Sequence, residues 1–527
     1  MDRVAIYDAT LRDGTQGEGV SLSVEDKLLI VARLDDVGID YIEGGFPGSN
    51  PKDSEFFELV RNKPLKHSKL VAFGSTRRAP VKAEEDPGLK AIAEAGAPAA
   101  AIFGKTWDLH VREVLRTSLK NNLNMIEDSV ACLKSAGLEV VYDAEHFFDG
   151  YRHNAEYALE TLRAAERGGA DWLVLCDTNG GALTWDLVKA VEDVVANVGA
   201  PVGIHAHNDS GLGAANSLAA VRCGATQVHG TINGYGERCG NADLCTIVPT
   251  LELKMNKRCL PEGNLPKLTE LALYVAEIAN QAPDESSPYV GNSAFAHKGG
   301  MHVDAIQKNP LTYEHVDPEL VGNRRRVLLS ELSGRSLILD KAREYDPGLN
   351  KDSPEIHRLF EELGDRELQG YLFEGAEGSF HLMLMKAFNK HKELFHRAGF
   401  RIIVDKATEG LVTSEATIKI GLGDKQAHTA AEGNGPVDAL DAALRKALRE
   451  FYPEIKNIHL TDYKVRVLEG AQGTASKVRV LMESTDNVTL WGTVGVSENI
   501  IEASWQALVD SLEYGLLYKK ARSNHES

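Results

Sequence analysis

The sequence predicts a (β/α)8 TIM barrel, followed by helical linker subdomains and a C-terminal α+β domain built from a repeated βββα unit. Two observations support this fold class. Eight short apolar segments alternate with amphipathic stretches over roughly the first 255 residues, which is the size of one such barrel. The last part of the chain repeats a pattern of three strands and a helix. We expect domains at 1–280, 281–398 and 399–520.

Eight segments are short and apolar, as strands buried on both faces should be. They are Val4–Asp8, Tyr41–Glu43, Lys69–Gly74, Ala99–Gly104, Glu139–Ala144, Trp172–Asp177, Val202–His207 and Gln227–Ile232. Amphipathic stretches between them predict helices, among them Val24–Val37, Asn154–Arg167 and Leu183–Asn197. An open doubly wound sheet is the alternative. It usually carries a glycine-rich loop after its first strand, and Asp8–Asp13 is not such a loop.

The predicted strands end in polar residues, and in a barrel these ends meet at one mouth. The polar residues are Arg12, Asp13, Gln16, Glu43, Glu145, His146, Asp177, Thr178, Asn179, His205, His207 and the loop Gly234–Asn241. Any one of them could be an ordinary loop residue. Together they indicate a polar pocket at the C-terminal face of the barrel.

Two histidines in this set have the spacing of metal ligands. His205 and His207 are two residues apart in a predicted strand, so both side chains project from one face. Two histidines hydrogen-bonded inside a core are the alternative. With the carboxylate of Asp13 they form a mixed donor set that suits a divalent ion and leaves positions open for substrate and water. Mg, Mn, Zn and Co could all use this set, and Asn241 could add a carbonyl oxygen or lie behind the ligands.

An ion at this place would act as a Lewis acid on a bound carbonyl oxygen. Arg12 would stabilise a developing oxyanion or bind a carboxylate, or it would simply pair with Asp13 or Glu43. Glu145 and Thr178 would flank the ion as hydrogen-bonding groups. The sequence therefore predicts an enzyme that activates a carbonyl substrate.

The composition limits the partners. A net charge of −19 gives no basic excess for a nucleic-acid partner. Six scattered cysteines without a CxxC pair are typical of reduced thiols in the cytoplasm. Neither a signal peptide nor an apolar run long enough to cross a membrane is apparent. We therefore expect a cytoplasmic protein with no nucleic-acid and no membrane partner.

Three motifs resemble the signatures of the α-isopropylmalate/homocitrate synthase family: Leu11–Gln16, His205–Asp209 and Gly236–Asn241. A wider superfamily of metal-dependent barrels includes this family and hydroxymethylglutaryl-CoA lyase. The resemblance covers nearly the whole chain, and within the family it is strongest to the members that make (R)-citramalate. It implies that acetyl-CoA is joined to a 2-oxo acid. A base removes a proton from the acetyl methyl group, the enolate attacks the ketone, and water hydrolyses the thioester.

The resemblance also implies roles for single residues. By this resemblance the residues expected to be catalytic are Arg12, Glu145, His302 and Tyr313. Phe295–Ala305 resembles the segment that folds over the barrel mouth, in this family often the mouth of the partner subunit. Asp304 and Asn309 are expected to contact the CoA thioester. Without the resemblance, His302 would be a plain loop histidine, and Arg324–Arg326 would be either a solvated face or a contact for CoA phosphates.

The C-terminal domain is predicted to contain two βββα units. Its expected strands are Arg401–Asp405, Glu415–Gly421, Gln426–Glu432, Tyr463–Glu469, Lys477–Ser484 and Thr489–Ser497. Helices follow from Pro436, where proline is favoured in the first turn, and from about Ile500. The domain resembles the family's regulatory domain, which dimerises and binds the end-product amino acid. We therefore expect a homodimer inhibited by isoleucine; an oligomerisation domain without a ligand is the alternative.

The acceptor is predicted from three bulky side chains near Glu145. Tyr142, Phe103 and Phe147 could fill the space that an isopropyl group would need, which favours pyruvate and makes Tyr142 a substrate-binding residue. The product would be citramalate, the entry to isoleucine by the pyruvate route. One methylene is worth only roughly 1–3 kcal/mol, so 2-isopropylmalate synthase, with 2-oxoisovalerate as acceptor for leucine biosynthesis, is the alternative. A reverse-cleaving lyase and a non-catalytic amino-acid sensor fit less well.

Overall fold

The structure is a computed structural model that describes residues 2–61, 63–327, 338–339, 341–343, 345–350, 352–406, 412–423, 425–468 and 476–523. It divides into two compact units. The first contains Met1–Phe295 and His315–Arg325, and the second contains Ala296–Glu314 and Arg326–Ser527. Among the described residues, every helix is too short or too polar to cross a lipid bilayer.

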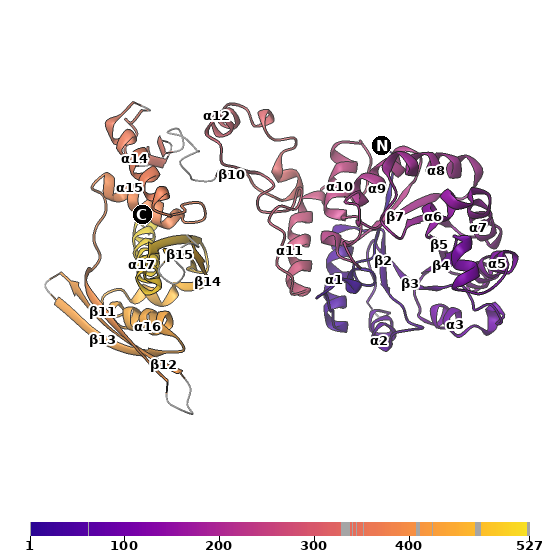
Figure 1. Cartoon of the computed structure of the whole chain (residues 1–527), viewed down its shortest axis with the longest axis horizontal. Coiled ribbons are helices and arrows are strands. Elements are labelled where there is room, and N and C mark those ends of the chain that lie inside the picture. Colours follow the sequence, from indigo (N-terminus) through magenta and orange to yellow (C-terminus); the bar gives the residue numbers. More distant parts are fainter. Residues whose placement is uncertain are drawn as a thin grey trace. The chain divides into compact units, whose positions relative to one another are not determined.

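The first unit is a closed barrel of eight parallel strands (Figure 1), which confirms the predicted fold class. The strands are β1 (Ala5–Asp8), β2 (Tyr41–Gly45), β3 (Lys69–Ser75), β4 (Ala99–Lys105), β5 (Glu139–Glu145), β6 (Trp172–Asp177), β7 (Val202–Ala206) and β8 (Gln227–Gly230). They follow one another around the barrel in chain order, and β1 closes it by pairing with β8. The expected strands are all present, with small shifts at their ends.

Helices connect the strands and surround the barrel (Figure 1). They are α1 (Val24–Val37), α2 (Pro51–Val60), α3 (Pro87–Glu94), α4 (Asp108–Glu113), α5 (Leu119–Ser135), α6 (Phe147–His153), α7 (Ala155–Gly168), α8 (Thr184–Asn197), α9 (Gly213–Arg222), α10 (Leu244–Leu253) and α11 (Leu268–Ile278). Helix α1 begins in a capping box, in which Ser23 and Asp26 each accept the other's backbone N–H. It ends at Gly38, whose φ of 93° suits glycine.

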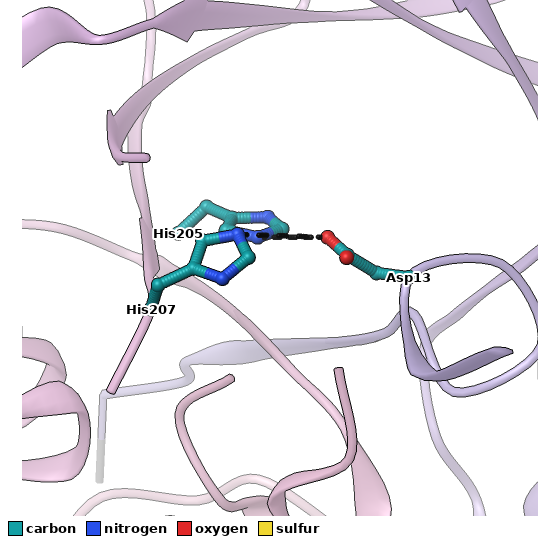
Figure 2. Close-up of side chains that lie close together, drawn as sticks. All are labelled: Asp13, His205 and His207. Atoms are coloured by element: carbon teal, nitrogen blue, oxygen red, sulfur yellow. Dashed lines mark ion pairs between the residues drawn. The ribbon is translucent and has the colours of Figure 1, made fainter. Parts of the chain in front are cut away.

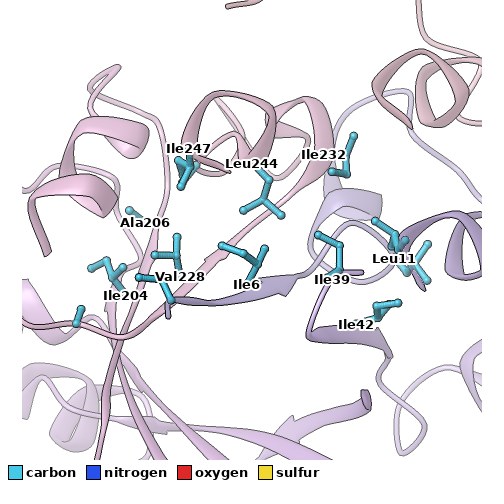
Figure 3. Packing of buried hydrophobic residues seen from close by; sticks show 14 of the residues in the cluster. Ile6, Leu11, Ile39, Ile42, Ile204, Ala206, Val228, Ile232, Leu244 and Ile247 are labelled. Carbon is cyan, nitrogen blue, oxygen red and sulfur yellow. The ribbon is translucent and has the colours of Figure 1, made fainter. Parts of the chain in front are cut away.

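Alternate residues of each strand face either the barrel axis or the helices. The axial layer is small, and its buried apolar residues are Tyr7, Ala9, Tyr41, Val71, Phe73, Ala99, Ala101, Val141, Val174 and Cys176. The layer between strands and helices is much larger; Figure 3 shows Ile6, Val228 and Leu244 within it. Polar side chains that point inward at the C-terminal strand ends therefore share a narrow mouth.

The second unit begins with a short parallel pair, β9 (Ala296–His297) and β10 (Arg326–Val327). Between them lie α12 (Gly300–Lys308) and the 3-10 turn η5 (Pro310–Thr312). Two further helices, α14 (Pro354–Leu368) and α15 (Glu377–Ala387), have their own apolar cluster, which β16 completes through Val494 and Val496. The helical stretch before the C-terminal domain is therefore packed against that domain.

Two βββα units complete the chain, as predicted. The first has β11 (His396–Lys406), β12 (Val412–Leu422), β13 (Lys425–Gly433) and α16 (Pro436–Leu448), and the second has β14 (His459–Val467), β15 (Val478–Thr485), β16 (Leu490–Ser497) and α17 (Ile500–Ser523). Each sheet is antiparallel in chain order. Both helices bury apolar residues in one common core. Glu469, the expected end of a strand, lies outside the described residues.

Candidate active site

Asp13, His205 and His207 meet at the C-terminal end of the barrel, as Figure 2 shows. His205 lies in β7, His207 follows the last residue of that strand, and Asp13 lies in the turn after β1. The Oδ2 atom of Asp13 is 3.3 Å from Nε2 of His205 and 3.9 Å from Nε2 of His207. All three side chains are buried, and one donor atom from each lies within 4.8 Å of the others.

Burial and neighbouring charges determine the protonation of these groups. Burial opposes ionisation of Asp13, but the Arg12 guanidinium and His205 outweigh it and hold the pKa of that carboxyl well below its usual range. Burial and the nearby His205 lower the pKa of His207 to about 4. Burial also disfavours the charged form of His205, yet Asp13 outweighs it and raises its pKa. These directions favour an ionised Asp13 and a neutral His207, which are the forms that can bind a cation.

Asn241 lies beside the histidines and bears on whether an ion fits. It forms an isolated antiparallel bridge with His207, and its Nδ2 donates to the Tyr235 carbonyl at 3.2 Å. Its Oδ1 is buried and has no hydrogen-bond partner within the described part of the chain. An unpartnered buried acceptor costs about 1–3 kcal/mol, which a cation would offset. The donor set of one carboxylate, two imidazoles and this amide oxygen thus fits a divalent ion.

Arg12 forms both of the ion pairs that the sequence left open. Its Nε donates to Glu43 Oε2 at 2.5 Å, and its Nη1 lies 3.1 Å from Asp13 Oδ2. The guanidinium also lies 3.8 Å from the centre of the Phe73 ring. Within the described residues Nη2 makes no hydrogen bond, so a fixed cation with donors to spare faces the mouth.

Glu145 is the last residue of β5, Thr178 follows the last residue of β6, and different contacts hold the two side chains at the mouth. The Glu145 carboxylate pairs with Lys105, the last residue of β4. The Thr178 hydroxyl accepts the backbone N–H of His146 at 2.8 Å, so its own proton is left to donate. His146 has a left-handed backbone with φ of 55°, which turns the chain sharply after β5.

The structure corrects the expectation for Tyr142. This side chain is fully buried in the layer between strands and helices, so it faces away from the mouth. The reason is the alternation along β5, which turns Asp143 and Glu145 inward and Tyr142 outward. Phe147 lies in the same outer layer. Of the three bulky residues expected to limit the acceptor, only Phe103 packs against the axial layer.

The residues expected beyond the barrel lie in the second unit. His302 of α12 stacks on Tyr313, with ring centroids 4.1 Å apart. Asp304 is on the same helix and pairs with Lys308 at 2.6 Å. Asn309 begins η5, where its Oδ1 accepts the N–H of Leu311 at 3.0 Å. The structure thus brings His302 and Tyr313 together on one short segment.

Lys105 and Asp143 are inward-facing residues at the mouth that sequence reasoning missed. Lys105 pairs with Glu145 in the register of β4 and β5. Asp143 is the preceding inward-facing residue of β5, two positions before Glu145. Asp143 is buried, and burial raises its pKa to about 7. Counting in steps of two from Phe103 and from Glu145 would have found both residues.

Comparison with known proteins adds family relationships. Residues 3–275 match the HMGL-like family, 289–367 the homocitrate synthase post-HMGL domain-like family, and 374–516 the LeuA allosteric (dimerisation) domain. The chain is 55% identical to the (R)-citramalate synthase of Geobacter sulfurreducens and 53% identical to that of Aquifex aeolicus, in each case over 98% of both chains. A probable 2-isopropylmalate synthase of Methanopyrus kandleri is 33% identical, over 96% of this chain and 97% of that protein.

Proposed function

Because the chain belongs to the (R)-citramalate synthase family, we propose that it condenses acetyl-CoA with pyruvate to give (R)-citramalate and free CoA. The observation that carries this proposal is the match to (R)-citramalate synthases along nearly the whole length of both chains. The protein is then an acyl-CoA:2-oxo acid C-acyltransferase. Its reaction is the first step of the pyruvate route to isoleucine.

The mouth offers the groups that this reaction needs on the side of the oxo acid. Asp13, His205, His207 and Asn241 would hold a divalent ion (Mg, Mn, Zn or Co), which when bound would supply Lewis-acid polarisation of the ketone. Arg12 is held by Glu43, so it presents a positive charge to the developing oxyanion without first having to reorient. The free proton of Thr178 suits the carboxylate of pyruvate.

The acetyl half of the reaction needs a base and a way to hold the thioester. The proton of the acetyl methyl group passes to a base, and the electron pair of that C–H bond forms the new bond to the ketone carbon. Water then cleaves the thioester, and the departing thiolate takes a proton to become CoA. We assign Glu145 to proton transfer and His302 and Tyr313 to the same half-reaction, with Asp304 and Asn309 at the thioester. The stacking of His302 on Tyr313 supports their joint role.

Release of free CoA from acetyl-CoA, measured with a panel of 2-oxo acids, tests the function. We expect kcat/KM for pyruvate to exceed that for 2-oxoisovalerate by at least about tenfold, in line with what an apolar pocket achieves for a few methyl groups. A preference for 2-oxoisovalerate would identify a 2-isopropylmalate synthase instead. Chiral analysis of the product would establish whether it is the (R) enantiomer.

The remaining parts of the proposal concern assembly and control. We propose that the C-terminal domain forms a homodimer and binds isoleucine, supported by the match of residues 374–516 to an allosteric dimerisation domain. The division into domains at 1–280, 281–398 and 399–520 belongs to the same proposal. A cytoplasmic location agrees with six free cysteines, several of them buried as ordinary apolar residues. Sedimentation with and without isoleucine would test both assembly and binding.

A further inference from the structure

Lys105 forms an ion pair with Glu145 at the barrel mouth, a contact that the reaction as described above does not use. The Cα atoms of the two residues are register partners across β4 and β5, and Nζ of Lys105 donates to Oε2 of Glu145. Their side chains are only 17% and 22% exposed, so solvent screens this pair less than a surface pair. Nζ also lies 5.4 Å from the centre of the Phe103 ring, on the same inward row.

The backbone on both sides of this pair is held in place. The Lys105 carbonyl accepts Nδ2 of Asn122 at 2.8 Å, which ties the end of β4 to α5. The N–H of Thr106 donates to the Glu145 carbonyl at 3.3 Å, which ties β4 to β5. Within the described residues, Lys105 is the one side chain that hydrogen-bonds to the Glu145 carboxylate. Lys105 is therefore the described side chain that is placed to orient that carboxylate.

We infer that Lys105 is a positioning residue for the condensation: it keeps the carboxylate of Glu145 aimed into the mouth. The inference rests on the proposed function, in which Glu145 takes part in proton transfer. A glutamate has three rotatable bonds, and a carboxylate without a partner would sample several rotamers. The ion pair with Lys105 restricts it to one, so the carboxylate is already oriented when the substrate arrives.

Steady-state CoA release by Lys105→Met and Lys105→Arg tests this role. Misplacing a reacting group by about 1 Å can cost roughly 100-fold, so Lys105→Met should lower kcat by between about 10- and 100-fold, with KM for pyruvate changed less than about threefold. Lys105→Arg keeps the charge and should retain at least about a third of kcat. The matched control is Lys69→Met, which breaks the Lys69–Glu139 pair at the opposite end of the barrel and should leave kcat unchanged.

A double variant distinguishes a Lys105 that positions Glu145 from a Lys105 that contacts the substrate directly. In Glu145→Gln, whose residual rate is already low, adding Lys105→Met should cause less than about a twofold further loss, because Lys105 acts through Glu145. Wild-type kcat in Lys105→Met, or the full loss in the Glu145→Gln background, would overturn the inference. If the wild-type chain releases CoA with no 2-oxo acid, the proposed function itself is overturned, and this role with it.

Discussion

Asp8 shows what burial does to a single carboxyl group in this barrel. The side chain is fully buried at the end of β1 and accepts the N–H and the hydroxyl of Thr10 at 3.0 and 2.8 Å. Burial raises its pKa to about 7, against a usual value near 4. Between these pH values the unfolded chain ionises Asp8 and the folded chain does not. Its contribution to the free energy of unfolding therefore falls as the pH rises from about 4 to about 7.

Asp8→Asn should remove this pH dependence, because the amide does not ionise and can still accept the Thr10 N–H. The free energy of unfolding of the variant minus that of the wild type should rise by up to about 4 kcal/mol between pH 4 and 7. Urea denaturation across this range measures it. Asp35→Asn is the control of opposite sign. Burial opposes ionisation of Asp35, but backbone N–H donors outweigh it and lower its pKa. The free energy of unfolding of that variant should therefore fall furthest below the wild-type value at neutral pH. A flat difference for Asp8→Asn would contradict the assignment.

His207→Ala should weaken the binding of a divalent ion by at least about 100-fold. Mutating a residue that only hydrogen-bonds to a metal ligand typically costs about 10- to 100-fold in affinity, and losing the ligand itself should cost more. Turnover should fall with it. Titration with Co²⁺, followed by its visible absorption, measures binding independently of activity. His153→Ala is the control, since His153 pairs with Asp108 outside the donor set. Wild-type affinity in His207→Ala would exclude it as a ligand.

Sequence spacing predicted the proposed metal donors but not every residue around them. Asp13, His205 and His207 could be found because they lie at the ends of strands that share one mouth. Tyr142 was misassigned because its size was considered without its place in the strand; an odd step from Glu145 puts it among the helices. Lys105 was missed because the inward-facing row of β4 was not followed two residues beyond Phe103.

The conformation of the loop Gly234–Asn241 depends on its glycines. Gly240 has φ of 85°, and a Cβ there would lie 2.0 Å from the Gly234 carbonyl oxygen. That same oxygen accepts the N–H of Asn241 at 3.0 Å. Any side chain at Gly240 would therefore displace Asn241 from the histidines.

Gly240→Ala should lower both kcat and affinity for the divalent ion by at least about tenfold, through movement of Asn241. Gly263→Ala is the matched control: its φ is 84°, and a Cβ there meets no atom within 4 Å. Both variants carry the backbone strain of about 1–2 kcal/mol, but only Gly240→Ala carries the clash. Equal losses in the two variants, measured by CoA release and Co²⁺ titration, would assign the effect to strain alone.

Element order was predictable because it depends on local pattern. Short apolar runs separated by amphipathic stretches determined the eight strands, and only their ends shifted. The packing of α15 with β16 was not predictable, since it joins Phe380 to Val494 across a long stretch of sequence. No periodicity in either segment identifies the other as its partner.

The whole chain contains separate cores in its two units, so unfolding should show two transitions. A divalent ion should raise the transition of the barrel unit alone, and isoleucine that of the C-terminal unit alone, because each ligand stabilises the unit that binds it. Differential scanning calorimetry with EDTA, Mn²⁺ and isoleucine measures this. A single transition that both ligands move equally would contradict the separation.

The interleaving of the units could not have been foreseen. Residues 296–314 belong to the second unit although 315–325 return to the first. A boundary expected at 280 assumes that each domain is one continuous stretch of sequence. Within the second unit β9 pairs with β10, and strands of only two residues leave no pattern to recognise in the sequence.

Closure of the barrel has a consequence for the chain during its synthesis. Residues 5–8 find their second hydrogen-bonding neighbour in residues 227–230. While the ribosome is still making the intervening segment, β1 has an open edge with unpaired N–H and C=O groups. A nascent chain stalled before Gln227 thus exposes a strand that its finished form protects, and chaperones would have to cover it.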